Sequence, residues 1–184
     1  MQLTTLNHFN RNKIAIPNNA TTSPEGEALT LLIAEMESVY LVSILGYSLF
    51  KELYDAYEAS IAVVPVPLTS KWLDLINGVE FTDSNGLLNK WTGFTDIKLS
   101  PIANYIYCEW QKIYISSTTG NGEQSPILPN SKRVSPIDKI VSAWNEMVDI
   151  NSVLHDFLIN NATVYDTYVY DLNSPLFKYR NQII

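Results

Sequence analysis

The chain has 184 residues, of which 46% are apolar and 11% aromatic, and its formal net charge is −7. This length favours one domain with terminal arms, and the apolar content excludes a disordered chain. Because binding to phosphates needs clustered Lys and Arg, the acidic balance argues against a protein that grips nucleic acid. The single cysteine, Cys108, excludes an internal disulfide. We find neither a signal peptide nor an apolar run long enough to span a bilayer, so we expect a cytoplasmic protein.

The first part of the chain predicts a polar arm followed by a long helical segment. Residues 1–22 are rich in Asn and Thr, and we expect a poorly ordered N-terminal arm there. Ser23, Pro24 and Glu25 are typical of a helix start, and apolar residues then follow at helical spacing to about Ala59. Gly46 weakens a helix interior, so this segment predicts either two packed helices or one bent helix.

A proline-containing connector separates this segment from a short helix and a hairpin. Pro65 and Pro67 stop a helix within residues 61–69. Ser70 is placed to cap a short helix that Gly78 ends. A small β-hairpin is predicted over residues 79–92, because alternating residues flank the turn sequence DSNG.

Two Ser-Pro pairs open the next helices. Ser100-Pro101 begins an aromatic-rich helix, and Ser135-Pro136 begins an amphipathic helix that runs to about residue 160. Trp144 lies in the middle of the apolar stripe of the second helix and is expected in the core. The polar segment 116–131 is long for a loop without secondary structure, and such loops are often functional.

The C-terminal segment, residues 163–184, is predicted to be a second arm that begins with a β-type alternation. The elements together predict a mainly α fold. It consists of a helical bundle of about four to five helices over residues 23–162, with one small β-hairpin and extended N- and C-terminal arms.

No pattern of catalytic, cofactor-binding or metal-ligating residues is found, so we expect no enzyme, no cofactor and no metal. The two histidines, His8 and His155, belong to no HxxxH, ExxH or CxxC spacing. Cys108 lies in mid-helix without an activating neighbour, and we expect a small buried hydrophobic side chain. Pairs such as Glu35 and Glu37 are typical of a solvated helix face.

The middle and C-terminal parts resemble a family of bacteriophage proteins. The sequence GVEFTDSNGLLNKWTGF leads into IANYIYCEWQKIY, and a polar loop with TTG and GE follows. The helix sequence SKRVSPIDKIVSAWNEMVDIN comes next. Over roughly residues 28–160 this order resembles the head–tail connector proteins of tailed bacteriophages, also called adaptor or neck ring proteins.

The resemblance implies a structural virion protein without catalytic residues. Such connectors are mainly helical and assemble in the host cytoplasm as a ring of identical copies, commonly a dodecamer, beneath the portal protein. The ring extends the DNA channel at the capsid–tail junction, and the next neck or tail protein docks on it. Double-stranded DNA then passes through the lumen without sequence-specific binding, and no membrane is involved.

In such connectors, loops and terminal extensions often contact the portal, and Tyr is enriched at interfaces. We also expect the alternation at 163–171 to add a strand to the hairpin of a neighbouring subunit. The residues predicted to contact the portal or a neighbouring subunit are Thr119, Asn121, Glu123, Gln124, Tyr165, Tyr168, Tyr170, Phe177 and Tyr179.

Two other interpretations fit the same sequence. One is another neck or tail-completion ring protein of the same particle, since this too would be a small helical ring subunit. The other is a non-viral soluble protein-binding module with an aromatic groove, which predicts a stable monomer. The sequence leaves these alternatives open.

Overall fold

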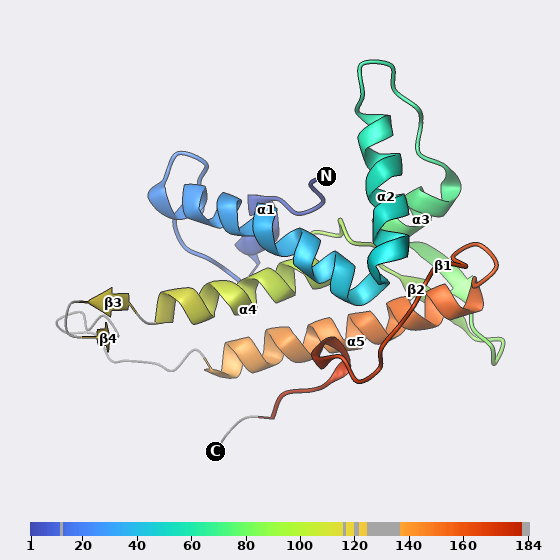
Figure 1. The fold of residues 1–184 in the computed structure, drawn as a ribbon. Helices are drawn as coiled ribbons and strands as arrows, with labels where there is room; N and C mark the ends of the chain where they lie inside the picture. The colour runs from blue at the N-terminus through green and yellow to red at the C-terminus, as the bar shows by residue number, and fades with distance from the viewer. Residues whose placement is uncertain (12, 116, 120–121, 125–136, 182–184) are drawn as a thin grey trace.

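The computed structural model describes residues 1–11, 13–115, 117–119, 122–124 and 137–181. The fold is mainly α with a small β-hairpin, as predicted. Figure 1 shows α4 and α5 side by side, with α1 packed against α4 and α2 rising from the end of α1. The helices are α1 (Pro24–Leu45), α2 (Tyr47–Ser60), α3 (Ser70–Asn77), α4 (Pro101–Ile115) and α5 (Ile137–Asn160).

The first long segment forms two helices that meet at a glycine. Ser23 caps α1, since its Oγ accepts a hydrogen bond from the Gly26 N–H at 3.0 Å, and Pro24 occupies the first turn. Gly46 separates α1 from α2 and has a φ of 76°, a conformation that a residue with a Cβ rarely adopts. The chain therefore changes direction at Gly46, and α2 projects away from the bundle (Figure 1).

The predicted hairpin is confirmed. Strands β1 (Val79–Thr82) and β2 (Leu88–Trp91) pair antiparallel, with Val79 opposite Trp91. The Asp83 carboxylate accepts hydrogen bonds from the Asn85 and Leu87 N–H groups at 2.9 Å, which fixes the turn. The predicted cap of the preceding helix is wrong by one residue: α3 begins at Ser70, and Thr69 occupies the capping position.

Helices α4 and α5 form the centre of the bundle. Ser100 caps α4, since its Oγ accepts a hydrogen bond from the Ala103 N–H at 3.3 Å. The predicted cap of α5, Ser135-Pro136, lies outside the described residues. Trp144 is 3% exposed and lies in the core, as predicted, and its Nε1 donates to the Lys178 carbonyl at 2.8 Å.

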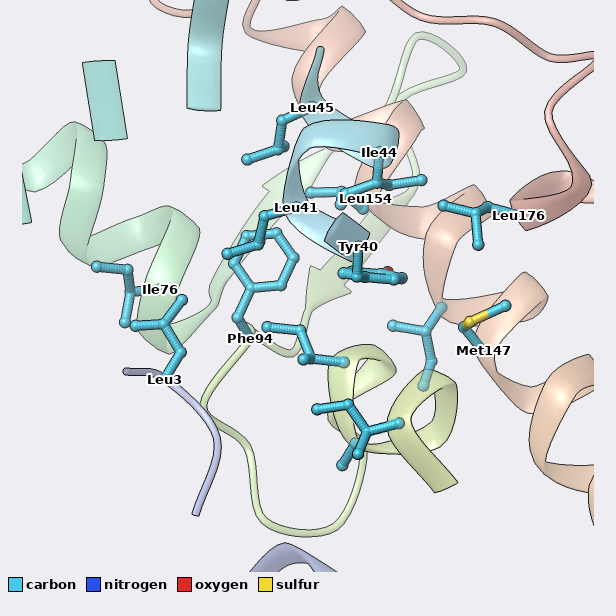
Figure 2. Close-up of a cluster of buried hydrophobic side chains, with 14 of the residues drawn as sticks. Leu3, Tyr40, Leu41, Ile44, Leu45, Ile76, Phe94, Met147, Leu154 and Leu176 are labelled. Atoms are coloured by element: carbon cyan, nitrogen blue, oxygen red, sulfur yellow. The ribbon is translucent and has the colours of Figure 1, made fainter. Parts of the chain in front are cut away.

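The N-terminal segment corrects the expectation of a poorly ordered arm. Residues 1–11 and 13–16 pack on the bundle, and a short 3₁₀ helix, η1 (Leu6–Asn10), forms within the first of these ranges. Figure 2 shows Leu3 in the same cluster as Leu41 of α1 and Ile76 of α3. The apolar residues of this segment that are buried are Leu3, Phe9, Ile14 and Ile16.

The C-terminal segment also packs on the core. Between residues 163 and 181 it consists of turns and a 3₁₀ helix, η2 (Pro175–Phe177), so the β-type alternation predicted at 163–171 does not form a strand in this chain. Leu176 of η2 is buried beside Met147 of α5 (Figure 2). Turn hydrogen bonds take the place of strand pairing there, because the Tyr165 N–H donates to the Asn161 carbonyl at 3.1 Å and the Tyr168 N–H to the Tyr165 carbonyl at 3.0 Å. The Asn151 side chain donates to the Leu176 carbonyl at 2.8 Å and holds the later part of the segment.

The polar segment 116–131 contains secondary structure, contrary to the prediction. Its described residues form two strands, β3 (Ser117–Thr119) and β4 (Gly122–Gln124), which pair antiparallel beyond the end of α4. The other residues of the segment, 116, 120–121 and 125–131, lie outside the described part of the chain.

Helix α1 corrects the expectation that no apolar run could span a bilayer. With 22 residues it is long and apolar enough to do so, judged by length and composition alone. Its residues Leu29, Tyr40 and Leu45 are buried inside the protein. A core helix satisfies the same criteria, so this finding is weak support for a membrane span.

Candidate assembly surfaces

Three of the predicted contact residues gather around His155 of α5. The His155 ring centroid lies 4.5 Å from that of Tyr170, 5.9 Å from Phe177 and 6.0 Å from Tyr168. The His155 Nδ1 also lies 3.1 Å from the Tyr168 hydroxyl. Burial lowers the pKa of His155, which favours the neutral imidazole in this cluster. The aromatic cluster therefore holds the C-terminal segment against α5.

The two remaining C-terminal candidates differ in exposure. Tyr165 is 3% exposed, packs on Phe157 with ring centroids 5.4 Å apart, and donates its hydroxyl hydrogen to the Lys71 carbonyl at 2.7 Å. It is a core residue in this chain and offers no surface to a partner. Tyr179 is exposed, and its hydroxyl donates to the Asp149 carboxylate at 2.6 Å. Tyr179 and the exposed ring of Tyr170 are thus the C-terminal candidates that a partner can reach.

The candidates in the polar segment lie on the β3–β4 pair. Thr119 ends β3 opposite Gly122, while Glu123 and Gln124 belong to β4. Asn121 lies outside the described residues. The contact role of all four remains a prediction.

The most exposed apolar segment is not among the predicted contacts. Residues 61–67, IAVVPVP, here called the apolar loop, connect α2 to α3. Val63 is 101% exposed and Val64 80%, and Ile61 and Val66 are also exposed. Figure 1 shows this loop beyond the end of α2, away from the rest of the bundle. The sequence predicts only a connector here. Its β-branched side chains are apolar, so their exposure to water is unfavourable.

A groove between α1 and α2 is another hollow with apolar side chains in its lining. It has a volume of about 400 Å³. Phe50 and Tyr54 lie in it with ring centroids 6.0 Å apart, and Tyr47 is exposed beside them. The only charged groups in its lining, Lys51 and Asp55, form an ion pair at 2.5 Å. This α1–α2 groove is lined by Ser38, Tyr47, Phe50, Lys51, Tyr54 and Asp55.

Buried polar contacts fasten the N-terminal segment to α1. The carboxylate of Glu37, which is almost fully buried, accepts hydrogen bonds from the Leu3 N–H at 3.0 Å and the Thr4 N–H at 2.8 Å. Burial raises the pKa of Glu37, and the two backbone hydrogen bonds oppose only part of this shift. Glu37 is therefore a structural anchor, so the expectation of a solvated face is wrong for Glu37, while Glu35 is exposed.

A second polar network fastens the same segment to α4 and α5. Glu146 accepts hydrogen bonds from Lys13 at 2.8 Å, Asn104 at 3.0 Å and Arg11 at 3.2 Å, and Arg11 also donates to Asn104. Burial alone would raise the pKa of Glu146, but the hydrogen bonds from Lys13 and Asn104 and the Arg11 charge outweigh burial and lower it. Glu146 thus stays ionised, and its interactions hold three segments together.

The single cysteine and the possible metal ligands are the side chains to consider for catalysis, and Cys108 lies in the core. Cys108 is buried, its Sγ lies 3.6 Å from the Ile140 carbonyl, and burial raises the pKa of the thiol to about 12. This confirms the expectation of a small buried side chain. Within the described ranges, no group of three or more His, Cys, Asp or Glu side chains is placed to hold a metal ion.

Comparisons of this chain with protein-family models, with curated proteins and with solved structures found no match. Its function is therefore inferred from its own residues.

Proposed function

We propose that this chain is a structural subunit that assembles with copies of itself into a ring. The ring joins the capsid to the tail of a tailed bacteriophage at the portal vertex and extends the DNA channel. In this role the portal protein binds on one side and the next neck or tail protein on the other, and the subunit acts by binding rather than by catalysis.

The observation that carries self-assembly is the apolar loop. A chain with a closed core leaves four aliphatic side chains exposed within seven residues at one projecting end. Contiguous apolar surface of this kind marks protein contact sites, because contact removes it from water. The α1–α2 groove adds a second surface of the same character on a different part of the chain.

The place at the phage junction rests on the order of elements and on charge. A hairpin, an aromatic-rich helix, a polar segment and a long amphipathic helix follow one another in the order that resembles the connectors. The net charge of −7 suits a channel subunit that DNA passes, because an acidic wall does not retain phosphates.

Native mass spectrometry over a wide concentration range tests this proposal. We expect a discrete closed oligomer near a dodecamer whose population grows with concentration, and electron microscopy of the same sample should show rings. A strict monomer at every concentration would contradict self-assembly and favour the soluble binding module. An open series of oligomers without a preferred size would contradict ring closure.

A further inference from the structure

The apolar loop projects beyond α2 (Figure 1), and the α1–α2 groove is a hollow that can receive an apolar side chain. The loop is a protrusion of Ile, Ala, Val and Pro, and the groove is a concave surface with three aromatic side chains. We propose that the apolar loop of one subunit inserts into the α1–α2 groove of a second copy of this chain. This contact rests on the proposed ring and names the interface that would build it.

Charge does not oppose a second copy at this contact. Two chains of net charge −7 repel each other, so contact between them is favoured where charge is locally absent or balanced. No charged residue lies between Glu58 and Lys71, a stretch that includes the whole loop. In the groove, Lys51 and Asp55 neutralise each other. Loop and groove therefore meet without juxtaposing like charges.

In this fold the loop lies beyond the end of α2, away from the groove of its own chain (Figure 1). The groove side chains on α2 run from Tyr47 to Asp55, and the loop follows the last residue of the same helix, Ser60. A continuous helix rises about 1.5 Å per residue, so α2 keeps the two surfaces apart along its axis. Because loop and groove are different surfaces, their contact is heterologous, and repetition of such a contact closes a ring or extends a filament.

The loop is also preorganised for insertion. Pro65 and Pro67 fix φ at their positions, and the valine side chains are stiff at χ1. The Val66 N–H donates to the Ala59 carbonyl at 3.0 Å, which closes the loop at its base. A rigid protrusion loses little conformational entropy on binding, which favours assembly through this segment.

Site-directed crosslinking of the full-length chain tests the contact. Val63→Cys and Ser38→Cys, combined in one chain, place one thiol on the loop and one in the groove. Treatment with a short bismaleimide should give a ladder of covalent oligomers on denaturing gels, because each subunit would link to two neighbours. Cys108 is buried and provides a low background. The matched control combines Val63→Cys with Ser84→Cys, an exposed position on the hairpin turn, and should give no ladder.

A charge substitution gives an independent readout. Val64→Asp introduces a carboxylate at an exposed position, so the melting temperature of the dilute monomer should not change. Assembly should then require at least roughly tenfold higher concentration, because a charge would enter an apolar groove. Leu88→Asp on β2, where Leu88 is 72% exposed, is the control and should assemble like the original chain.

The outcomes separate this contact from the proposed function. A ladder from the chain that combines Val63→Cys with Ser38→Cys, together with weakened assembly of Val64→Asp, supports the contact. An oligomer that forms normally with Val64→Asp, or that crosslinks equally well in the Ser84→Cys control, overturns the contact and leaves the ring standing. A monomeric original chain at every concentration overturns the contact and self-assembly together.

Discussion

The N-terminal segment and the apolar loop differ from what their sequences suggest: the more polar segment packs on the core, and the apolar one is exposed to solvent. Residues 1–16 are largely polar, yet Phe9 and Ile14 are completely buried. The loop at 61–67 has no polar side chain at all, yet it stands in water at the end of α2 (Figure 1). The difference lies in the available partners: Glu37 and Glu146 satisfy the polar groups of the first segment, and no part of the described chain covers the second.

Local hydropathy therefore did not decide burial in either region. A segment is buried when its polar groups find hydrogen bonds and its few apolar side chains find a cavity that they fill. An apolar segment stays exposed when the backbone that carries it points away from the core. The exposed apolar surface of the loop is therefore a consequence of the architecture of this chain.

The largest expected effect comes from the core of the N-terminal segment. Phe9→Ala should lower the free energy of unfolding by about 3–5 kcal/mol, because it leaves a cavity at a fully buried site. Trp144→Ala in α5 should cost a similar amount and serves as the reference for a core helix. Urea unfolding measures both, and a loss below about 1 kcal/mol for Phe9→Ala would contradict an integral N-terminal segment.

Removal of the Glu37 anchor should have the next largest effect. Glu37→Ala leaves the Leu3 and Thr4 N–H groups without their acceptor and should cost about 1–3 kcal/mol. The exposed Glu35→Ala on the same helix is the matched control and should be close to neutral. Chemical unfolding of the two variants under identical conditions measures the difference.

Glu37 should also make stability depend on pH in a defined direction. Its pKa is raised in the folded state, so the folded chain binds this proton more tightly than the unfolded chain. Its contribution is therefore most favourable at low pH and is lost as pH rises from the ordinary value of 4.5 through the raised pKa. Glu37→Gln should remove this slope from a series of unfolding curves, and an unchanged slope would contradict the assignment.

Glu146 should show the opposite dependence. Its pKa is lowered, so its stabilising contribution is present above the ordinary value of 4.5 and is lost as pH falls through the lowered pKa. Glu146→Gln should flatten this acid-side loss, while the exposed Glu80→Gln should leave it unchanged. Thermal unfolding at a series of acidic pH values measures the two slopes.

The smallest effect is expected from the apolar loop. Val63→Ser and Val64→Ser should change the free energy of unfolding of the monomer by no more than about 0.5 kcal/mol, because neither side chain is buried. Urea unfolding at a dilution that keeps the chain monomeric measures this. A loss of unfolding free energy comparable to that of Phe9→Ala would show that the loop belongs to the core. The two regions would then not differ in burial.

Local signals predicted the helices and the hairpin well. Ser23 and Ser100 act as caps, Gly46 divides the first helical segment, and the turn sequence DSNG closes the predicted hairpin. These features depend on interactions within a few residues, which the sequence displays directly.

The candidate surfaces were less predictable. Tyr165 and Tyr170 are the same residue type in the same C-terminal alternation. Tyr165 is nevertheless a core residue, because it packs beside Phe157 and its hydroxyl donates to the Lys71 carbonyl. The α1–α2 groove had no signal in the sequence, because its lining joins Ser38 of α1 to side chains between Tyr47 and Asp55 of α2, across the break at Gly46. Surfaces of this kind depend on the angle between elements, which local patterns do not encode.

The sequence by itself determined the helical class, the hairpin, the buried character of Trp144 and Cys108, and the acidic charge balance. Only the tertiary structure decided that both terminal segments belong to the core and that the apolar loop does not. The reason is physical: burial depends on which distant groups, such as Glu37 for Leu3 or Asn151 for Leu176, complete hydrogen bonds and packing.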